Sequence, residues 1–211
     1  RSALNGNPKH IGAHYLLAVV LLERNEFSEA IAELQKVLQL QPAHWEAQHQ
    51  LGLAQLQNNN PSAAVDSLRR CVVSKPSSAT AHYNLGLAWG QTGDLEQATA
   101  EFRRAIELDR AFAPAHSRLG VALRRKGDLP GALIQFKEAV RLNPKNAEDH
   151  YNFGMALKAQ GELEKAIAEF QIALKERPHD PEIRYNFAMA RWRQRKLDEA
   201  EEELRLYMRQ R

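Results

Sequence analysis

Four histidines recur at a fixed interval, and they are the first candidates in this chain for metal binding or proton transfer. They are His14, His82, His116 and His150, and the steps between them are 34 residues or twice that number. Imidazole rings are common metal ligands and proton carriers. A shared zinc ion would need every ligand atom about 2 Å away, whereas equivalent residues of neighbouring helical repeats lie roughly 8–10 Å apart. We therefore expect these histidines to be packing residues, and we predict no metal site.

No stretch of the chain carries a catalytic motif. The sequence has no glycine-rich phosphate loop, no H-E-x-x-H, no G-x-S-x-G and no calcium-binding loop. The carboxylates are scattered at positions typical of helix surfaces, where such groups are usually solvated. We predict a protein that is not an enzyme and that uses no cofactor.

The spacing of the histidines belongs to a 34-residue repeat that runs through the whole chain. Gly93, Gly127 and Gly161 are separated by this step, as are six alanines: Ala30, Ala64, Ala98, Ala132, Ala166 and Ala200. A fixed period of this length is typical of an array of small stacked units. The register predicts six units within one continuous solenoid domain: residues 11–44, 45–78, 79–112, 113–146, 147–180 and 181–211. Residues 1–10 are predicted to be the tail of a truncated preceding repeat, because Pro8 lies one period before Pro42.

Within each unit, numbered from place 1, the residue types predict two helices and a turn. Places 7 and 24 are large and apolar, whereas places 8, 10 and 20 are nearly always Gly or Ala, so two helices can approach closely. Place 15 is glycine in three units and asparagine in two, residue types that tolerate the left-handed end of a helix. Place 32 is proline in four units: Pro42, Pro76, Pro144 and Pro178. A proline there stops the second helix.

These residues resemble the tetratricopeptide repeat (TPR) family over essentially the whole chain. The shared features are the large residues at places 7 and 24, small residues at 8, 20 and 27, and proline at 32. The resemblance implies an all-α protein, a right-handed α-solenoid of tandem helix–turn–helix repeats. The last unit differs, because Arg191, Arg195 and Glu201 replace the apolar or turn-forming residues of most other units. A polar end face suits a terminal repeat, so 181–211 is predicted to be the sixth repeat and the C-terminal cap.

The resemblance also implies that the first helix of each unit lines a concave inner face. There, place 5 is mostly tyrosine, place 6 is often asparagine and place 9 is apolar. Amides can both donate to and accept from the backbone of an extended peptide, while tyrosine and methionine offer adaptable apolar contacts. The predicted partner-binding residues are Tyr83, Asn84, Leu87, Arg118, Val121, Tyr151, Asn152, Met155, Tyr185 and Asn186. The alternative is that place 9 is half-buried and the tyrosines pack against the next unit.

Basic residues on the first helices of the last three units predict a positive patch beside this face: Arg124, Arg125, Lys158, Arg184 and Arg193. Such a patch favours a protein or peptide partner with acidic side chains or a C-terminal carboxylate, and a solvated basic face is the alternative. The TPR clamp for a terminal carboxylate is not expected, because place 2 is never lysine. Nucleic acid is not expected either, because the net charge is only +3 and glutamates are interleaved with the arginines.

The resulting prediction is a non-catalytic scaffold for protein–protein interaction that binds a peptide or helix of a partner in its concave groove. The alternative is a substrate-recruiting arm of a larger enzyme, because the row of amides resembles the superhelix of O-linked N-acetylglucosamine transferases. The single cysteine, Cys71, excludes an intrachain disulfide and favours a reducing compartment such as the cytoplasm. The longest apolar run, residues 16–22, is too short to span a membrane.

Overall fold

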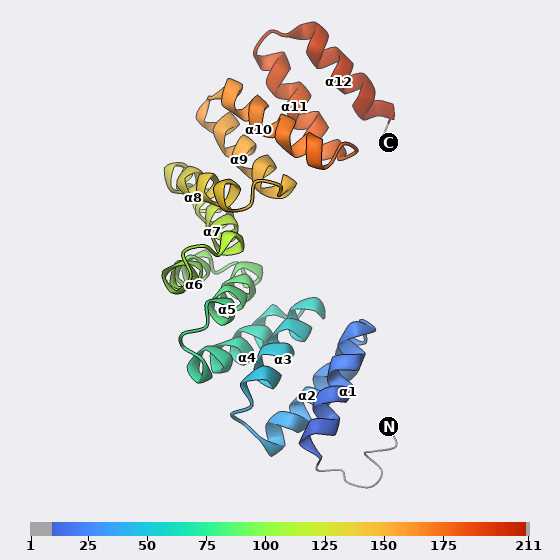
Figure 1. Ribbon diagram of the computed structural model, residues 1–211, viewed down its shortest axis with the longest axis vertical. Coiled ribbons are helices and arrows are strands. Elements are labelled where there is room, and N and C mark those ends of the chain that lie inside the picture. The colour runs from blue at the N-terminus through green and yellow to red at the C-terminus, as the bar shows by residue number, and fades with distance from the viewer. Residues whose placement is uncertain (1–9, 210–211) are drawn as a thin grey trace. The chain divides into compact units, whose positions relative to one another are not determined.

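The computed structural model describes residues 10–209, and in this range it contains twelve α-helices and no strand. The chain divides into two compact units, Arg1–Arg110 and Ala111–Arg211, and each is described by itself. Unit 1 contains α1 to α6 and unit 2 contains α7 to α12 (Figure 1). The predicted truncated repeat falls almost wholly on residues 1–9, which lie outside the described residues. The single continuous solenoid domain stays a prediction.

Helix pairs repeat with the period seen in the sequence. In unit 1 the helices are α1 (Ile11–Glu23), α2 (Phe27–Leu40), α3 (Trp45–Gln57), α4 (Pro61–Ser74), α5 (Ala79–Thr92) and α6 (Leu95–Leu108). In unit 2 they are α7 (Ala113–Arg125), α8 (Leu129–Leu142), α9 (Ala147–Gln160), α10 (Leu163–Glu176), α11 (Pro181–Arg193) and α12 (Leu197–Arg209). Each odd-numbered helix begins at place 1 of its unit. The predicted fold class, an all-α solenoid of helix–turn–helix repeats, is confirmed.

The turn inside each helix pair depends on one residue with a positive φ angle. Gly93, Gly127 and Gly161 have φ values of 91°, 86° and 90°, and asparagines occupy the same place in the first two repeats. In the last repeat the residue is Arg195, with φ 64°. A side chain with a Cβ is strained in this conformation by about 1–2 kcal/mol, so the last turn is built at a cost that glycine avoids.

Close packing of the two helices of a pair depends on small residues at place 8. A Cβ added to Gly86 would lie 2.7 Å from Cε1 of Phe102, and the equivalent Gly120 and Gly154 face Phe136 and Phe170 in the same way. Both Phe136 and Phe170 are fully buried. The absence of a side chain at place 8 therefore creates the space that the phenylalanine ring at place 24 fills.

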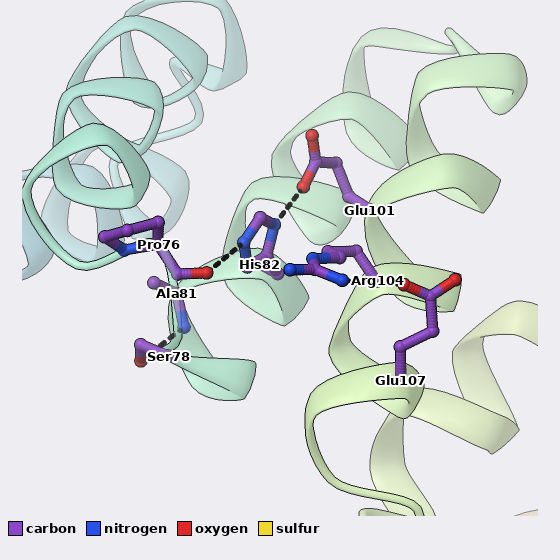
Figure 2. Close-up of polar contacts among 7 residues, drawn as sticks. All are labelled: Pro76, Ser78, Ala81, His82, Glu101, Arg104 and Glu107. Carbon is purple, nitrogen blue, oxygen red and sulfur yellow. Dashed lines mark hydrogen bonds and ion pairs between the residues drawn. The ribbon is translucent and has the colours of Figure 1, made fainter.

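The periodic histidines connect helices of the same repeat to the preceding loop. Figure 2 shows His82, whose Nδ1 lies 2.6 Å from Oε2 of Glu101 on α6 and whose Nε2 lies 3.2 Å from the carbonyl oxygen of Pro76. His150 makes the same pair of contacts, at 2.6 Å to Glu169 and 3.1 Å to the Pro144 carbonyl. Both ring nitrogens thus face acceptors, and each of the two side chains connects the helices of its own repeat to the loop that precedes them.

Candidate functional site

The ten residues predicted for the inner face are divided between the two units. Three lie on α5 of unit 1: Tyr83, Asn84 and Leu87. Seven lie on the first helices of unit 2: Arg118 and Val121 on α7, Tyr151, Asn152 and Met155 on α9, and Tyr185 and Asn186 on α11. Unit 2 therefore holds the larger part of the candidate site, and its geometry can be followed within one compact unit.

In unit 1 the amide of Asn84 is already used inside the protein. Its side chain is only 6% exposed, and its Nδ2 lies 2.6 Å from Nε2 of His49 on the preceding odd-numbered helix. Burial lowers the pKa of His49, which favours the neutral ring that can accept this hydrogen bond. Tyr83 is half-buried, with its ring 5.9 Å from that of Phe102. These contacts give Asn84 a structural role.

In unit 2 four side chains from α9 and α11 form a chain of hydrogen bonds. The Tyr151 hydroxyl donates to Oε1 of Glu182 at 2.8 Å, and Nδ2 of Asn186 donates to the Tyr151 oxygen at 3.1 Å. Lys158 donates through Nζ to Oδ1 of Asn186 at 2.6 Å. The network fixes Tyr151 and Asn186 in orientation, so this part of the predicted inner face is preorganised.

Burial is the main electrostatic influence on this network. It raises the pKa of the Tyr151 phenol, which the hydrogen bond to Glu182 and the charge of that carboxylate raise further. Burial also lowers the pKa of the Lys158 ammonium, and the nearby charge of Arg193 adds to this effect. Tyr151 therefore remains a neutral donor to Glu182 through the physiological pH range.

Asn152 differs from its equivalents because its amide has no hydrogen-bond partner among residues 10–209, although its side chain is only 9% exposed. Asn84 and Asn186 each bond to the place-5 ring of the preceding repeat, His49 and Tyr151 respectively. For Asn152 the corresponding residue is Ser117, whose side chain is too short to form a hydrogen bond with the Asn152 amide.

The Ser117 hydroxyl is bonded instead to Asp149, which lies on α9 and is 2% exposed. Burial raises the pKa of the Asp149 carboxyl, and the Ser117 hydrogen bond partly opposes that shift. The replacement of an aromatic ring by serine at place 5 therefore has two results. It gives a buried carboxylate a donor, and it leaves the neighbouring Asn152 amide without one.

A pocket of about 280 Å³ opens beside the free amide of Asn152. Its lining consists of Glu148, Tyr151, Asn152, Arg177, Asp180, Glu182 and Ile183. Tyr151 and Asn152 are predicted site residues, whereas the three carboxylates and Arg177 are not. A signal for two of them was present in the sequence, because Glu148 and Glu182 occupy place 2, which the family pattern directs inward.

The remaining predicted apolar residues are partly covered by the protein itself. Leu87, Val121 and Met155 are all half-buried, and Met155 packs against the core cluster that contains Phe170 and Phe187. Tyr185 is 43% exposed, with its ring 5.5 Å from that of Tyr207. The half-buried alternative for place 9 therefore describes Leu87, Val121 and Met155.

The predicted basic patch is smaller than the sequence suggested. The guanidinium of Arg184 is bonded within the protein, because it donates to Glu203 at 2.5 Å and to the Pro178 carbonyl at 2.6 Å. Lys158 is half-buried and bonded to Asn186. Arg118 forms an exposed ion pair with Glu148 at 3.6 Å. The other members of the patch, Arg124, Arg125 and Arg193, are exposed.

Unit 1 contains a larger hollow that involves none of the predicted site residues. It has a volume of about 500 Å³ and is lined by residues of α2, α3 and α4. At its wall, the Ser67 hydroxyl donates to Oε1 of Gln55 at 2.7 Å. Gln55 occupies place 11, where most units carry leucine or tryptophan, so a polar pair replaces apolar packing at this junction.

Family models match almost the entire described chain. A model described as tetratricopeptide repeat matches residues 49–111 and 151–211, and another of the same description matches residues 11–44. A third, described as TPR repeat, matches residues 122–161. The chain belongs to the tetratricopeptide repeat family. Repeats of this family are generally non-catalytic, and the solved structures similar to this chain include protein-interaction scaffolds.

Solved TPR structures share this fold over most of their length. MamA is 25% identical with a TM-score of 0.72, covering 79% of this chain and 91% of its own. YrrB, described as a TPR protein with an unusual peptide-binding site, is 23% identical with a TM-score of 0.70 and coverage of 93% and 97%. PilF of Pseudomonas aeruginosa is 18% identical with a TM-score of 0.81 and coverage of 96% and 90%. The likeness to YrrB and PilF concerns the fold.

A search of curated protein sequences returned no match to this TPR chain. Among residues 10–209, none of the helices combines the length and the apolar character that crossing a bilayer requires.

Proposed function

We propose that this TPR protein is a non-catalytic scaffold whose inner face binds an extended peptide segment of a partner protein, with α9 at the centre of the contact. The observation that carries the proposal is the free amide of Asn152, which lines the pocket of about 280 Å³. The amide atoms of Asn152 are not among the fully buried unpartnered atoms of the described residues, so water reaches them in the free protein. A peptide backbone would supply both a donor and an acceptor in place of that water.

The surroundings of Asn152 support a peptide as the ligand. The hydrogen-bond network holds Tyr151 and Asn186 in fixed orientations, so binding would not have to order them. Met155 adds a half-buried thioether on the same helix, which suits varied apolar side chains. Arg124 and Arg193 are exposed nearby and would attract acidic groups elsewhere on the partner. A substrate-recruiting arm of a larger enzyme would use this same surface.

The proposal can be tested by panning a random 12-residue peptide library, displayed on phage, against the purified chain. Peptides that bind the inner face should lose about tenfold in affinity when Asn152→Ala removes two hydrogen bonds. Helicity and thermal stability should be unchanged, because Asn152 bonds to no other residue of the described chain. Gln171→Ala, an exposed amide on α10, is the matched control. If no selected peptide responds to Asn152→Ala more than to the control, the proposed function is wrong.

A further inference from the structure

We propose that the pocket beside Asn152 receives a lysine or arginine side chain of the bound peptide, so that the partner segment is anchored by a basic residue. This inference rests on the proposed function and adds the chemical class of the anchor. It runs opposite to the acidic partner that the sequence suggested, because the lining of the pocket carries more carboxylates than cations. Glu148, Asp180 and Glu182 face one guanidinium, that of Arg177.

The decisive group is the carboxylate of Glu182. Its Oε1 accepts the hydroxyl of Tyr151, which is a neutral donor, and no cation of residues 10–209 lies within ion-pair distance of it. A carboxylate accepts hydrogen bonds through about four lone-pair sites, so most of its capacity is open. Glu182 is exposed, so water solvates its charge in the free protein, and a guanidinium or ammonium group from a partner would replace that water.

The other two carboxylates are only weakly compensated. Glu148 pairs with Arg118 at 3.6 Å, but both side chains are more than 40% exposed, at 46% and 43%. Asp180 uses Oδ1 to cap α11 through the backbone N–H groups of Glu182 and Ile183, and its Oδ2 lies 3.9 Å from Arg177, which is 55% exposed. Exposed pairs of this kind contribute about 0–1 kcal/mol and are screened by salt. Among the lining residues carboxylates therefore outnumber cations by three to one, while Arg118 and Arg124 lie close by but outside the lining.

Asn152 supplies an independent sign that the pocket takes a ligand. Residue Asn152 is nine-tenths buried and lines the same pocket, and its amide, which has no hydrogen-bond partner in the described chain, stays open to solvent. Directed at the backbone of a bound segment, it would hold the residue whose side chain enters between α9 and α11. One amide for the backbone and one carboxylate for the side chain are the minimal elements of a site that reads a basic residue in an extended peptide.

The test uses the peptides that the phage library yields on the purified chain, counter-selected on the Asn152→Ala variant. Asn152-dependent peptides should be enriched in lysine or arginine at one position. Synthesis of one such peptide with citrulline, which keeps the shape of arginine without its charge, should weaken binding about tenfold or more. The variant Glu182→Gln keeps an acceptor for Tyr151 and should bind the arginine and citrulline peptides equally. Glu176→Gln, an exposed carboxylate on α10, should preserve the difference.

The outcomes separate the two proposals. Asn152-dependent peptides without a favoured basic residue, or arginine and citrulline peptides of equal affinity for the unaltered chain, would overturn the basic anchor and leave the proposed function intact. A preference for arginine that survives in Glu182→Gln would also overturn it, because the carboxylate would not be the group that recognises the charge. The absence of any Asn152-dependent peptide would remove both proposals together.

Discussion

The contact between place 8 and place 24 allows a stability prediction with a matched control in the same helix. Gly86→Ala adds a Cβ that would lie 2.7 Å and 2.8 Å from Cε1 and Cδ1 of Phe102, where ordinary contacts begin at 3.4 Å. The ring would have to retreat by roughly 0.7 Å, yet it is only 3% exposed and has neighbours on all sides. Gly90→Ala, one turn further along α5, adds a Cβ that meets nothing within 4 Å.

The two substitutions share one effect and differ in the other. Both replace glycine by alanine inside a helix, which stabilises by about 0.8–1.0 kcal/mol. Only Gly86→Ala overpacks the core, at a cost of about 1–3 kcal/mol. We expect Gly90→Ala to be more stable than the unaltered chain, and Gly86→Ala to lie below Gly90→Ala by the overpacking cost alone.

A second substitution identifies the ring as the cause. The first repeat pairs Ala18 at place 8 with Leu34 at place 24, and both are fully buried. Adding Phe102→Leu to Gly86→Ala recreates that pair, so the double variant should be more stable than the sum of the two single changes by about 1 kcal/mol or more. Urea unfolding followed by helical circular dichroism measures the unaltered chain, the three single variants and the double variant, with midpoints compared at equal m-values because repeat arrays can unfold in parts. Equal shifts for Gly86→Ala and Gly90→Ala would refute the reasoning.

Three further predictions concern single side chains. Arg195→Gly should stabilise the last repeat by about 0.5–1 kcal/mol in urea unfolding, because φ 64° strains arginine and not glycine; a loss of stability would contradict this. His150→Ala should cost about 2–3 kcal/mol and His150→Gln less than about 1 kcal/mol, because Gln48 already reaches the Pro42 carbonyl at 2.6 Å from the same place; equal losses would show that the hydrogen bond to the Pro144 carbonyl does not stabilise the repeat. Burial raises the pKa of Asp149, so the ionised carboxylate destabilises the fold as pH rises through its folded-state value. Asp149→Asn should therefore raise the melting temperature at pH 7, with a gain that shrinks as pH falls towards the ordinary value of 3.8, and a gain independent of pH would disprove the assignment.

Much of the fold was predictable because the same residue types recur at the same places of several repeats, so each helix and turn is indicated more than once. The positive φ angles at Gly93 and at Asn25 occur where the period requires a helix-ending residue. The helix starts follow the same register, and the small residues at place 8 face the large ones at place 24. The role of His82 was less accessible, because its acceptors come from two other segments and the bonds depend on how those segments meet.

The candidate site was predicted only in part, and the errors have one physical origin. Place number gives the direction of a side chain but not the partner that it finds. Asn84, Asn152 and Asn186 share place 6, yet two of them are engaged and one is free. Arg184 was predicted for a binding patch, but Glu203 and the Pro178 carbonyl hold its guanidinium. Interactions between neighbouring repeats decided each case, and a pattern within one repeat does not contain them.

The departures from the repeat at the junction of α7 and α9 support the proposed site on energetic grounds. Place 3 is alanine in four repeats and isoleucine in the sixth. In the fifth repeat it is Asp149, a carboxylate with 2% exposure. Burying such a group costs stability unless it is paired, and its donor here is the Ser117 hydroxyl. Serine at place 5 in turn removes the ring that would have bonded Asn152. Both departures thus meet beside one amide that lines a pocket, which is where the proposed function places the peptide backbone.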